Sequence, residues 1–336
     1  MSSCCKQECT ELVEGCTDFI EECAVLRPQS SLNPDSFHSQ YEVLKTIGRG
    51  YTAEVKLAKR LTGAEVAVKV INKRELWSEA AIMRKMNHPN IISLLQVIDS
   101  DKKTYLIMEL AEGEQLYEYV RKADHLKEDE ARGIFRQILS AVSYCHKIGI
   151  IHRDLKPDNI IIDRKGNVKI IDFGLGTQVK PGQVVSFFGA TYAFGAPELL
   201  VDGLYDGPKA DIWALGVLLY YMVVGNLPFC AVTSQELEKQ IVTCKYTVPL
   251  GLSEELRDLL SFLMTVSPRR RPTVDEVMTH PWLKKDVEAL PNACEEMVPS
   301  LPDPAILEAM EHIGFQAQDI KESLWLGFLC SLALHS

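Results

Sequence analysis

The spacing of apolar residues changes once along this chain, and the change restricts the folds open to it. Between residues 41 and 72, apolar and β-branched residues recur at every second position in YEVLKTIG, EVKLAKR and AEVAVKVI. This alternation predicts strands that are buried on one face and joined as an antiparallel meander. From Glu114 onward the period lengthens to three and four residues and predicts helices. The clearest series is Ala131, Ile134, Phe135, Ile138, Leu139 and Val142. We therefore expect an α+β fold, with a small antiparallel sheet before a larger helical region.

The acidity of the chain is confined to its two ends. The formal net charge is −10, and residues 1–40 hold seven acidic and two basic residues, while residues 284–336 hold nine and three. The region between them is therefore nearly neutral. A chain with this balance does not attract a phosphate backbone through its overall charge, so we expect no nucleic acid partner.

Two stretches of linker-like composition set the expected domain boundaries. Residues 27–39 are rich in Pro, Ser and Asn, and residues 291–304 contain four prolines. Such stretches have little to bury and separate folded units. We expect a flexible, cysteine-containing acidic tail over 1–40, a folded domain over 41–283 and a linker over 284–301.

The first residues, MSSCCKQECTELVEG, do not have the pattern of a secretory signal. No basic segment precedes an apolar one, so we expect a cytoplasmic protein whose ten cysteines do not form a disulfide framework. The apolar runs at 212–224 and 324–334 are shorter than the roughly 20 residues that a spanning helix needs, so we expect no transmembrane segment.

A glycine-containing turn between two expected strands is the first candidate for a binding site. Gly48 and Gly50 lie in GRGYTAEV, which has two of the three glycines of the phosphate-binding pattern G-x-G-x-x-G-x-V. Strand-like sequence on both sides places this turn at the tip of a hairpin. A dinucleotide site, in which the loop runs from a strand into a helix, is therefore excluded. Alone, the pattern also fits an ordinary hairpin turn.

A lysine and a glutamate in apolar surroundings are the second candidate. Lys69 ends the apolar segment VAVK, where its ammonium requires an anionic partner unless it is solvated at the strand end. Glu79 lies in ELWSEAAIMRKM on one stripe with Ile82 and Met83, where an unpaired carboxylate is out of place. We favour Glu79 over Glu75 as the partner of Lys69.

The strongest signal comes from three strings in the second half of the domain. The string IHRDLKPDN ends at Asn159, DFG begins thirteen residues later at Asp172, and APE follows from Ala196. These motifs, in this order after VAVK, resemble those of the eukaryotic protein kinases. The resemblance covers about 41–283. It implies the two-lobed kinase fold, with a small antiparallel-sheet lobe over 41–109 and a larger helical lobe over 110–283.

The resemblance implies that the chain binds ATP and Mg²⁺. Lys69, held by Glu79, would bind the α- and β-phosphates, and Asp172 and Asn159 would be the metal ligands. The glycines of the hairpin tip would cover the phosphates. The adenine pocket would be formed by Ile47, Val55, Ala67 and Ile161, with Met108 as gatekeeper and Glu109 to Ala111 as the hinge. These apolar residues would serve equally well as core.

The resemblance also assigns catalytic roles. Asp154 would accept the proton of the substrate hydroxyl, and Lys156 would steady the γ-phosphate, as is typical of serine/threonine kinases. Two residues would support the site: Asp211, expected to open a long apolar helix, would hold the catalytic loop, and Arg271 would pair with Glu198.

Longer stretches narrow the resemblance to one group of kinases. FHSQYEVLKTIGRG, AVSYCHKIGIIHRDLKPDN and YDGPKADIWALGVLLY are similar to the AMP-activated-kinase-related group, especially the microtubule-affinity-regulating kinases and the sperm motility kinases. The implied activity is that of a non-specific serine/threonine protein kinase acting on protein substrates, with sperm motility signalling as its setting.

The end of the chain resembles part of a ubiquitin-associated domain. Residues 302–324 have the apolar spacing of its first two helices, although any amphipathic helical pair would fit, and residues 325–336 form an apolar tail in place of the third helix. A pair of helices of this size is too small to fold alone. Either the apolar tail substitutes as the third helix, or the segment packs on the kinase domain, or it is an exposed apolar end; binding to ubiquitin is a further hypothesis.

Two departures from the family favour an alternative. Only nine residues separate Lys69 from Glu79, fewer than in relatives, so the helix that carries Glu79 is shortened and its docking could be loose. In the activation segment, the stretch between DFG and APE, Phe187 stands where relatives have a phosphorylated threonine that pairs with Arg153, with Ser186 beside it. The alternative is a nucleotide-binding pseudokinase scaffold with little turnover.

Overall fold

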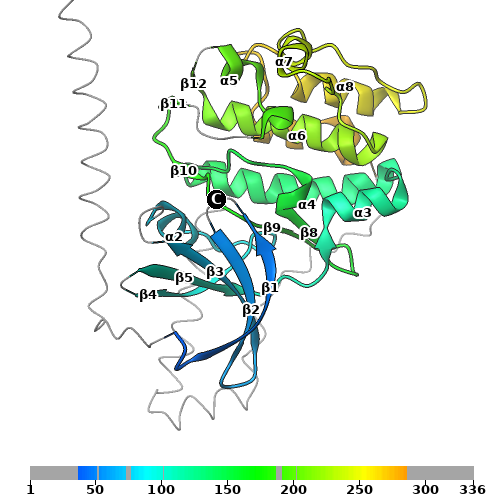
Figure 1. Cartoon of the computed structure of the whole chain (residues 1–336). Coiled ribbons are helices and arrows are strands. Elements are labelled where there is room, and N and C mark those ends of the chain that lie inside the picture. Colours follow the sequence, from blue (N-terminus) through cyan, green and yellow to red (C-terminus); the bar gives the residue numbers. More distant parts are fainter. Residues whose placement is uncertain are drawn as a thin grey trace, which may run out of the picture. The chain divides into compact units, whose positions relative to one another are not determined.

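The computed structural model in Figure 1 describes most of the predicted domain, namely residues 37–50, 53–72, 77–100, 102–186, 191–201 and 203–285. Most of the acidic tail, the linker after residue 285, the segment that resembles a ubiquitin-associated domain and the apolar tail lie outside these residues.

A five-stranded antiparallel sheet forms the first part of the fold, with the strand order β1-β2-β3-β5-β4 (Figure 1). The strands are β1 Tyr41–Arg49, β2 Ala53–Arg60, β3 Glu65–Asn72, β4 Leu94–Asp99 and β5 Lys103–Glu109. The first three are joined by consecutive hairpins, so the predicted meander is confirmed.

Strand β3 shows how the alternation sorts side chains onto the two faces of the sheet. Val66 and Val68 belong to a small core on one face. Ala67 and Ile71 belong to the main core on the other face. Lys69 lies between Ala67 and Ile71 in the same alternation, so it faces the second half of the chain.

The small core of the sheet includes Phe37, which precedes Tyr41. Phe37 is only 3% exposed. It stacks on Tyr105 with ring centroids 4.2 Å apart and on Tyr41 with centroids 5.5 Å apart. These rings complete the small core on the face of Val68. The linker-like stretch before residue 40 therefore ends in an anchoring residue that composition did not reveal.

Helix α2, Trp77–Met83, carries Glu79. Its residues Ala80, Ile82 and Met83 are buried in the main core, which confirms the predicted apolar stripe. The helix contacts β4 and the short strand β10, Thr177–Gln178.

Helices α3, Leu116–Ala123, and α4, Glu128–Lys147, begin the second part. All six apolar residues of the predicted series are buried on α4. The helical region starts slightly later than predicted, because Glu114 and Gln115 form strand β6 (Glu114–Gln115), paired with β8, Ile160–Ile162. This pairing holds the two residues in an extended conformation.

Helix α6, Gly207–Val224, is the buried centre of the second part. It does not open at Asp211, as we predicted, but one turn earlier. The Asp206 carboxylate caps it by accepting the Lys209 N–H, and Pro208 stands in its first turn, both common helix-start signals. Asp211 is thereby placed inside the helix, where it faces the loop that follows α4.

Short strand pairs fix the loops around α6. Strand β7, Ile150–Ile151, pairs with β10, and β8 pairs with β9, Val168–Ile170. Strand β11, Val185–Ser186, pairs with β12, Leu204–Tyr205. The loop between β7 and the 3₁₀ turn η1, Pro157–Asn159, which is the predicted catalytic loop, is therefore anchored at both ends.

The remaining described helices complete the predicted helical lobe: four of them contact α4 or α6, and the other two contact each other. They are η2 Tyr192–Phe194, α5 Pro197–Val201, α7 Ser234–Val242, α8 Glu254–Leu263, α9 Val274–Met278 and α10 Pro281–Lys284. Within the described part of the chain, we find no helix whose length and apolar character would suffice to span a bilayer.

Candidate active site

A cleft between the sheet and the helical lobe brings together the residues predicted to contact a nucleotide. Its volume is about 630 Å³. All twelve of these residues line it: Ile47, Gly48, Gly50, Val55, Ala67, Lys69, Glu79, Met108, Glu109, Ala111, Ile161 and Asp172. Lys156 and Asn159 line it as well. The sequence did not identify a further set of lining residues: Arg49, Ile92, Gly113, Asp158 and Ile171. For Ile171 a signal was present, since it directly precedes the DFG motif.

The roof of the cleft is the β1–β2 hairpin. Gly48 pairs with Val55 across the two strands. The Gly50 N–H donates to the Ala53 carbonyl at 2.8 Å, which closes the turn toward the hairpin tip. The glycines therefore lie at a hairpin, as predicted, and residues 51 and 52 of its tip are outside the described residues.

Lys69 binds two carboxylates at once. Its Nζ lies 2.7 Å from Glu79 Oε1 and 2.7 Å from Asp172 Oδ1. Glu79 is almost fully buried, at 1% exposure. Burial lowers the pKa of Lys69, but the negative charges of Glu79 and Asp172 outweigh burial and raise the pKa above its ordinary value. The ammonium is therefore charged and held in one place at the back of the cleft.

Asp172 adopts a strained backbone conformation that aims its carboxylate at Lys69. Its φ is 61°, in the left-handed region that residues other than glycine rarely adopt. The Gly174 N–H donates to Oδ1 at 3.2 Å and steadies the turn. Burial raises the pKa of Asp172, but the charge of Lys69 outweighs it and lowers the pKa below its ordinary value. Asp172 is thus an anion at neutral pH.

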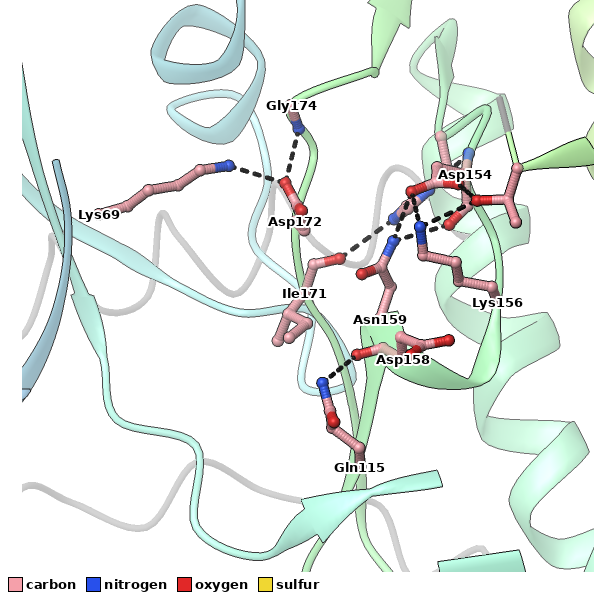
Figure 2. Close-up of polar contacts among 11 residues, drawn as sticks. Lys69, Gln115, Asp154, Lys156, Asp158, Asn159, Ile171, Asp172 and Gly174 are labelled. Atoms are coloured by element: carbon pink, nitrogen blue, oxygen red, sulfur yellow. Dashed lines mark hydrogen bonds and ion pairs between the residues drawn. The ribbon is translucent and has the colours of Figure 1, made fainter. Parts of the chain in front are cut away.

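The Asp154 carboxylate is surrounded by donors (Figure 2). Asn159 Nδ2 donates to the Asp154 carbonyl at 2.8 Å and to Oδ2 at 3.0 Å. Lys156 Nζ lies 2.7 Å from Oδ2. The Thr191 hydroxyl donates to Oδ1 at 2.9 Å. Asp154 does not line the main cleft but a small adjoining cavity. A cation, an amide and a hydroxyl thus fix its orientation at the edge of the cleft.

Asp211 holds the predicted catalytic loop from inside α6, as we expected. Its carboxylate accepts the His152 N–H at 3.0 Å and the Arg153 N–H at 2.9 Å. His146 Nε2 lies 2.9 Å from the same carboxylate. The residues just before Asp154 are therefore attached to the most buried helix of the lobe.

At the hinge, the side chain of Glu109 is already engaged. Its carboxylate accepts the Ser93 N–H at 2.7 Å and lies 2.7 Å from Lys169 Nζ. Burial raises the pKa of Glu109, but the hydrogen bonds from Lys169 and Ser93 and the charge of Lys169 lower it further than burial raises it. A ligand at the hinge would therefore meet the backbone of this segment rather than the Glu109 carboxylate.

The predicted pairing of Arg271 with Glu198 is confirmed. Two guanidinium nitrogens of Arg271 donate to the two Glu198 oxygens at 2.7 and 2.9 Å, and both side chains are buried. Such a bidentate pair fixes relative orientation as well as distance. It ties the APE motif to the loop between α8 and α9.

The oxygen atoms of Asp172 and Asn159 fit a magnesium ion. Asn159 turns its amide nitrogen toward Asp154, which leaves the amide oxygen pointing away from Asp154 (Figure 2). The Asp172 side chain is 47% exposed, and its contacts with described residues all go to Oδ1. Mg²⁺ favours oxygen ligands, and in phosphoryl-transfer sites it takes few from the protein and the rest from phosphates and water. No cluster of three or more His, Cys, Asp or Glu side chains offers another metal site among the described residues.

Comparison with known proteins identifies the relatives of this chain. Residues 41–283 match the model of the protein kinase domain. The chain is 58% identical over 296 residues to sperm motility kinase 2A of Mus musculus, an alignment that covers 86% of the chain. It is 57% identical over 306 residues to sperm motility kinase 3A, covering 89%, and 48% identical over 300 residues to sperm motility kinase Z, covering 88%, both of Mus musculus. The alignments span 59% to 61% of the length of these relatives.

Proposed function

The chain belongs to the protein kinase domain family, and from this premise we propose that it transfers the γ-phosphate of ATP to serine and threonine hydroxyls of proteins. The observation that carries this proposal is the position of Lys69, whose ammonium contacts both Glu79 and Asp172 at 2.7 Å inside the cleft. Phosphoryl transfer depends mainly on positioning and on electrostatic stabilisation, and it requires this lysine–glutamate pair together with the metal-binding aspartate.

The nucleotide would lie between the hairpin roof and strand β8. Ile47, Val55 and Ala67 would cover the adenine and Ile161 would support it, because these side chains line opposite walls of one cavity. Met108 would limit the depth of the pocket, and the backbone of Glu109 and Ala111 would bind the edge of the base. Gly48 and Gly50 would let the roof approach the phosphates without side-chain obstruction.

Charged residues at the inner end of the cleft would hold the triphosphate. Lys69 would bind the α- and β-phosphates, since Glu79 and Asp172 keep it charged and in place. Asp172 and Asn159 would hold Mg²⁺, which would neutralise part of the phosphate charge. Lys156, beside Asp154, would contact the γ-phosphate.

Asp154 would receive the proton of the attacking hydroxyl. Its Oδ1 already accepts a hydrogen bond from an alcohol, the Thr191 hydroxyl, at 2.9 Å, so the carboxylate is oriented to accept one from a serine or threonine. Proton transfer requires hydrogen-bond contact between the base and the hydroxyl. Lys156 two residues further on supports the choice of serine/threonine over tyrosine substrates.

The alternative of an inactive scaffold rests on the shortened connection between Lys69 and Glu79 and on Phe187 in the activation segment, which lies outside the described residues. That connection nevertheless leaves the ion pair formed and Glu79 buried. We therefore favour the active enzyme.

The wider setting is proposed from the relatives and the sequence. The relatives are named sperm motility kinases, and we propose that this chain also acts in sperm motility, in the cytoplasm and within the AMP-activated-kinase-related group. The partial ubiquitin-associated segment, proposed to contact ubiquitin or the kinase domain, lies outside the described residues.

Incorporation of labelled phosphate tests the function. The purified chain should transfer ³²P from γ-labelled ATP to a generic basic peptide in the presence of Mg²⁺, and phosphoserine and phosphothreonine should be the products. Asp154→Asn should abolish transfer while ATP still raises the melting temperature. Equal incorporation by the wild type and Asp154→Asn would refute the proposed role, and phosphotyrosine as the product would refute the substrate class.

A further inference from the structure

Arg153 occupies a backbone conformation that its surroundings must hold. Its φ is 65°, in the left-handed region, and its N–H donates to Asp211 Oδ1 at 2.9 Å. Because Arg153 directly precedes Asp154, a shift in its backbone would move the carboxylate proposed as the base. The contacts of the Arg153 side chain therefore bear on the catalytic loop.

The Arg153 guanidinium connects three segments that are distant in sequence. Its Nε donates to the carbonyl of Leu175, directly after the DFG motif, at 2.5 Å. Its positive charge also acts on the hydroxyl of Tyr205 on β12, and the two residues line one small cavity. The same side chain thus links the catalytic loop, the start of the activation segment and the strand that precedes α6.

Tyr205 is buried at the junction of the three segments that meet at the Arg153 side chain. It is 4% exposed, whereas its strand neighbour Leu204 is 57% exposed, so the tyrosine ring points inward. It lines the small cavity that Arg153, Asp154 and Thr191 also line. Across the β11–β12 pair its backbone lies opposite Val185 of the activation segment.

We propose that Tyr205 is a positioning residue that holds Arg153, and with it the activation segment, in the arrangement required for phosphoryl transfer. The inference rests on the proposed function. Among the described residues, the groups beside the guanidinium are neutral groups of the chain itself, the Leu175 carbonyl and the Tyr205 phenol, so this junction needs no phosphate. Burial raises the pKa of Tyr205, and the charge of Arg153 opposes this without cancelling it, so the hydroxyl is neutral at physiological pH.

The test replaces only the hydroxyl. Tyr205→Phe should lower kcat about tenfold, the effect of losing one polar contact with a charged group, and leave the KM for ATP within about twofold. Amide exchange at Val185, Ser186 and Arg153 should accelerate. Tyr220→Phe is the matched control, since Tyr220 is 5% exposed and donates its hydroxyl to the Thr247 carbonyl at 2.6 Å, remote from Arg153. It should change neither kcat nor exchange in β11.

A double-mutant cycle separates positioning from a general loss of stability. If Tyr205 acts through Arg153, Tyr205→Phe should add little to the effect of Arg153→Gln on kcat. Additive effects would overturn the proposal, and so would an equal effect of Tyr220→Phe. Treatment of the wild type with a protein phosphatase should leave kcat unchanged, and a large loss would show that a phosphate is needed.

The readouts also distinguish this proposal from the proposed function. If the wild type transfers phosphate and Tyr205→Phe is unchanged in kcat, only the role of Tyr205 is refuted. If the wild type transfers none, the proposed function fails, and amide exchange alone decides whether Tyr205 holds the activation segment. Unaltered exchange in Tyr205→Phe would then overturn the positioning role.

Discussion

Glu79 reaches Lys69 across a connection of only nine residues, and the two side chains approach to 2.7 Å between Oε1 and Nζ. The contact forms because Ala80 and Ile82 of the short helix α2 are buried in the main core and dock the helix beside β4. The second oxygen of Glu79 is buried without a hydrogen-bond partner among the described residues. The orientation of Glu79 therefore depends on Lys69 and on the packing of α2.

Removing the charge of Glu79 should slow catalysis more than it weakens nucleotide binding. Glu79→Gln keeps the shape of the side chain but replaces an ion pair by a weaker hydrogen bond to Lys69. We expect kcat to fall roughly 10- to 100-fold, from the cost of losing one charge-assisted hydrogen bond. The KM for ATP should rise less than kcat falls, because the adenine pocket is untouched. Steady-state kinetics with a peptide substrate measures both.

Glu75→Gln is the control for Glu79→Gln, since Glu75 was the rival partner of Lys69 in the sequence. It should leave kcat unchanged. An equal loss of kcat in both variants would contradict the assignment of Glu79 as the partner that matters.

Gly113 makes the hinge intolerant of a side chain. Its φ is 119°, and a Cβ built there would lie 2.1 Å from the Ile162 carbonyl oxygen. Gly113→Ala should push the hinge away from β8, lower the melting temperature and raise the KM for ATP several-fold. Gly63→Ala is the matched control, because Gly63 has a φ of 101° but no described atom beyond its own residue and its chain neighbours within 4 Å of the added Cβ. A KM unchanged in Gly113→Ala would show that the hinge adapts.

Glu128 fastens the end of the domain to helix α4. Its Oε1 accepts the Ser253 N–H at 2.7 Å, and its Oε2 accepts the Ser253 hydroxyl at 2.7 Å and the Trp282 indole N–H at 2.9 Å. Glu128→Gln would replace one of the two accepting oxygens by an NH₂ group, which cannot accept a hydrogen bond from the donors of Ser253 and Trp282. We expect it to lower the free energy of unfolding by about 2 kcal/mol at pH 7.

The stabilisation by Glu128 should depend on pH. Burial raises the pKa of Glu128, but the hydrogen bonds from Ser253 and Trp282 outweigh burial and lower it below the ordinary value of 4.5. A carboxylate with a lowered pKa in the folded state stabilises fully above its unfolded pKa and loses this effect as pH falls through the folded pKa. The difference in urea midpoint between wild type and Glu128→Gln should therefore be constant from pH 8 to 6 and shrink below about pH 4.5. A difference that persists undiminished at pH 3.5 would contradict this assignment.

The sequence predicted elements wherever local spacing and motif order carried the information. The alternation around Val66 and Val68 specifies which face of β3 carries Lys69. The motifs identify Asn159 and Asp172, which line the cleft, and Asp154, which lines the cavity beside it. These features are encoded in short stretches of sequence, so they could be predicted without knowledge of the contacts between distant segments.

Contacts between distant segments were not predictable in the same way. Tyr205 is one of 11 tyrosines, and although it opens the stretch YDGPKADIWALGVLLY, the sequence does not show that β12 pairs with β11 and brings it beside Arg153. The start of α6 was misplaced because the apolar run after Asp211 conceals the capping residue Asp206 one turn earlier. The requirement for glycine at position 113 likewise comes from the backbone of β8, which is nearly fifty residues away in the sequence.

Phe37 gives the last prediction, because it anchors the sheet from outside the predicted domain. Its ring lies between Tyr41 and Tyr105 in the small core, and Phe37→Ala would leave a cavity there. We expect a loss of about 3 kcal/mol in the free energy of unfolding, with the KM for ATP little changed because this core lies on the face of the sheet opposite to Lys69. Leu44→Ala, at an exposed position on β1, should cost less than about 0.5 kcal/mol. Equal losses from the two substitutions, measured by urea denaturation, would show that Phe37 does not anchor the sheet.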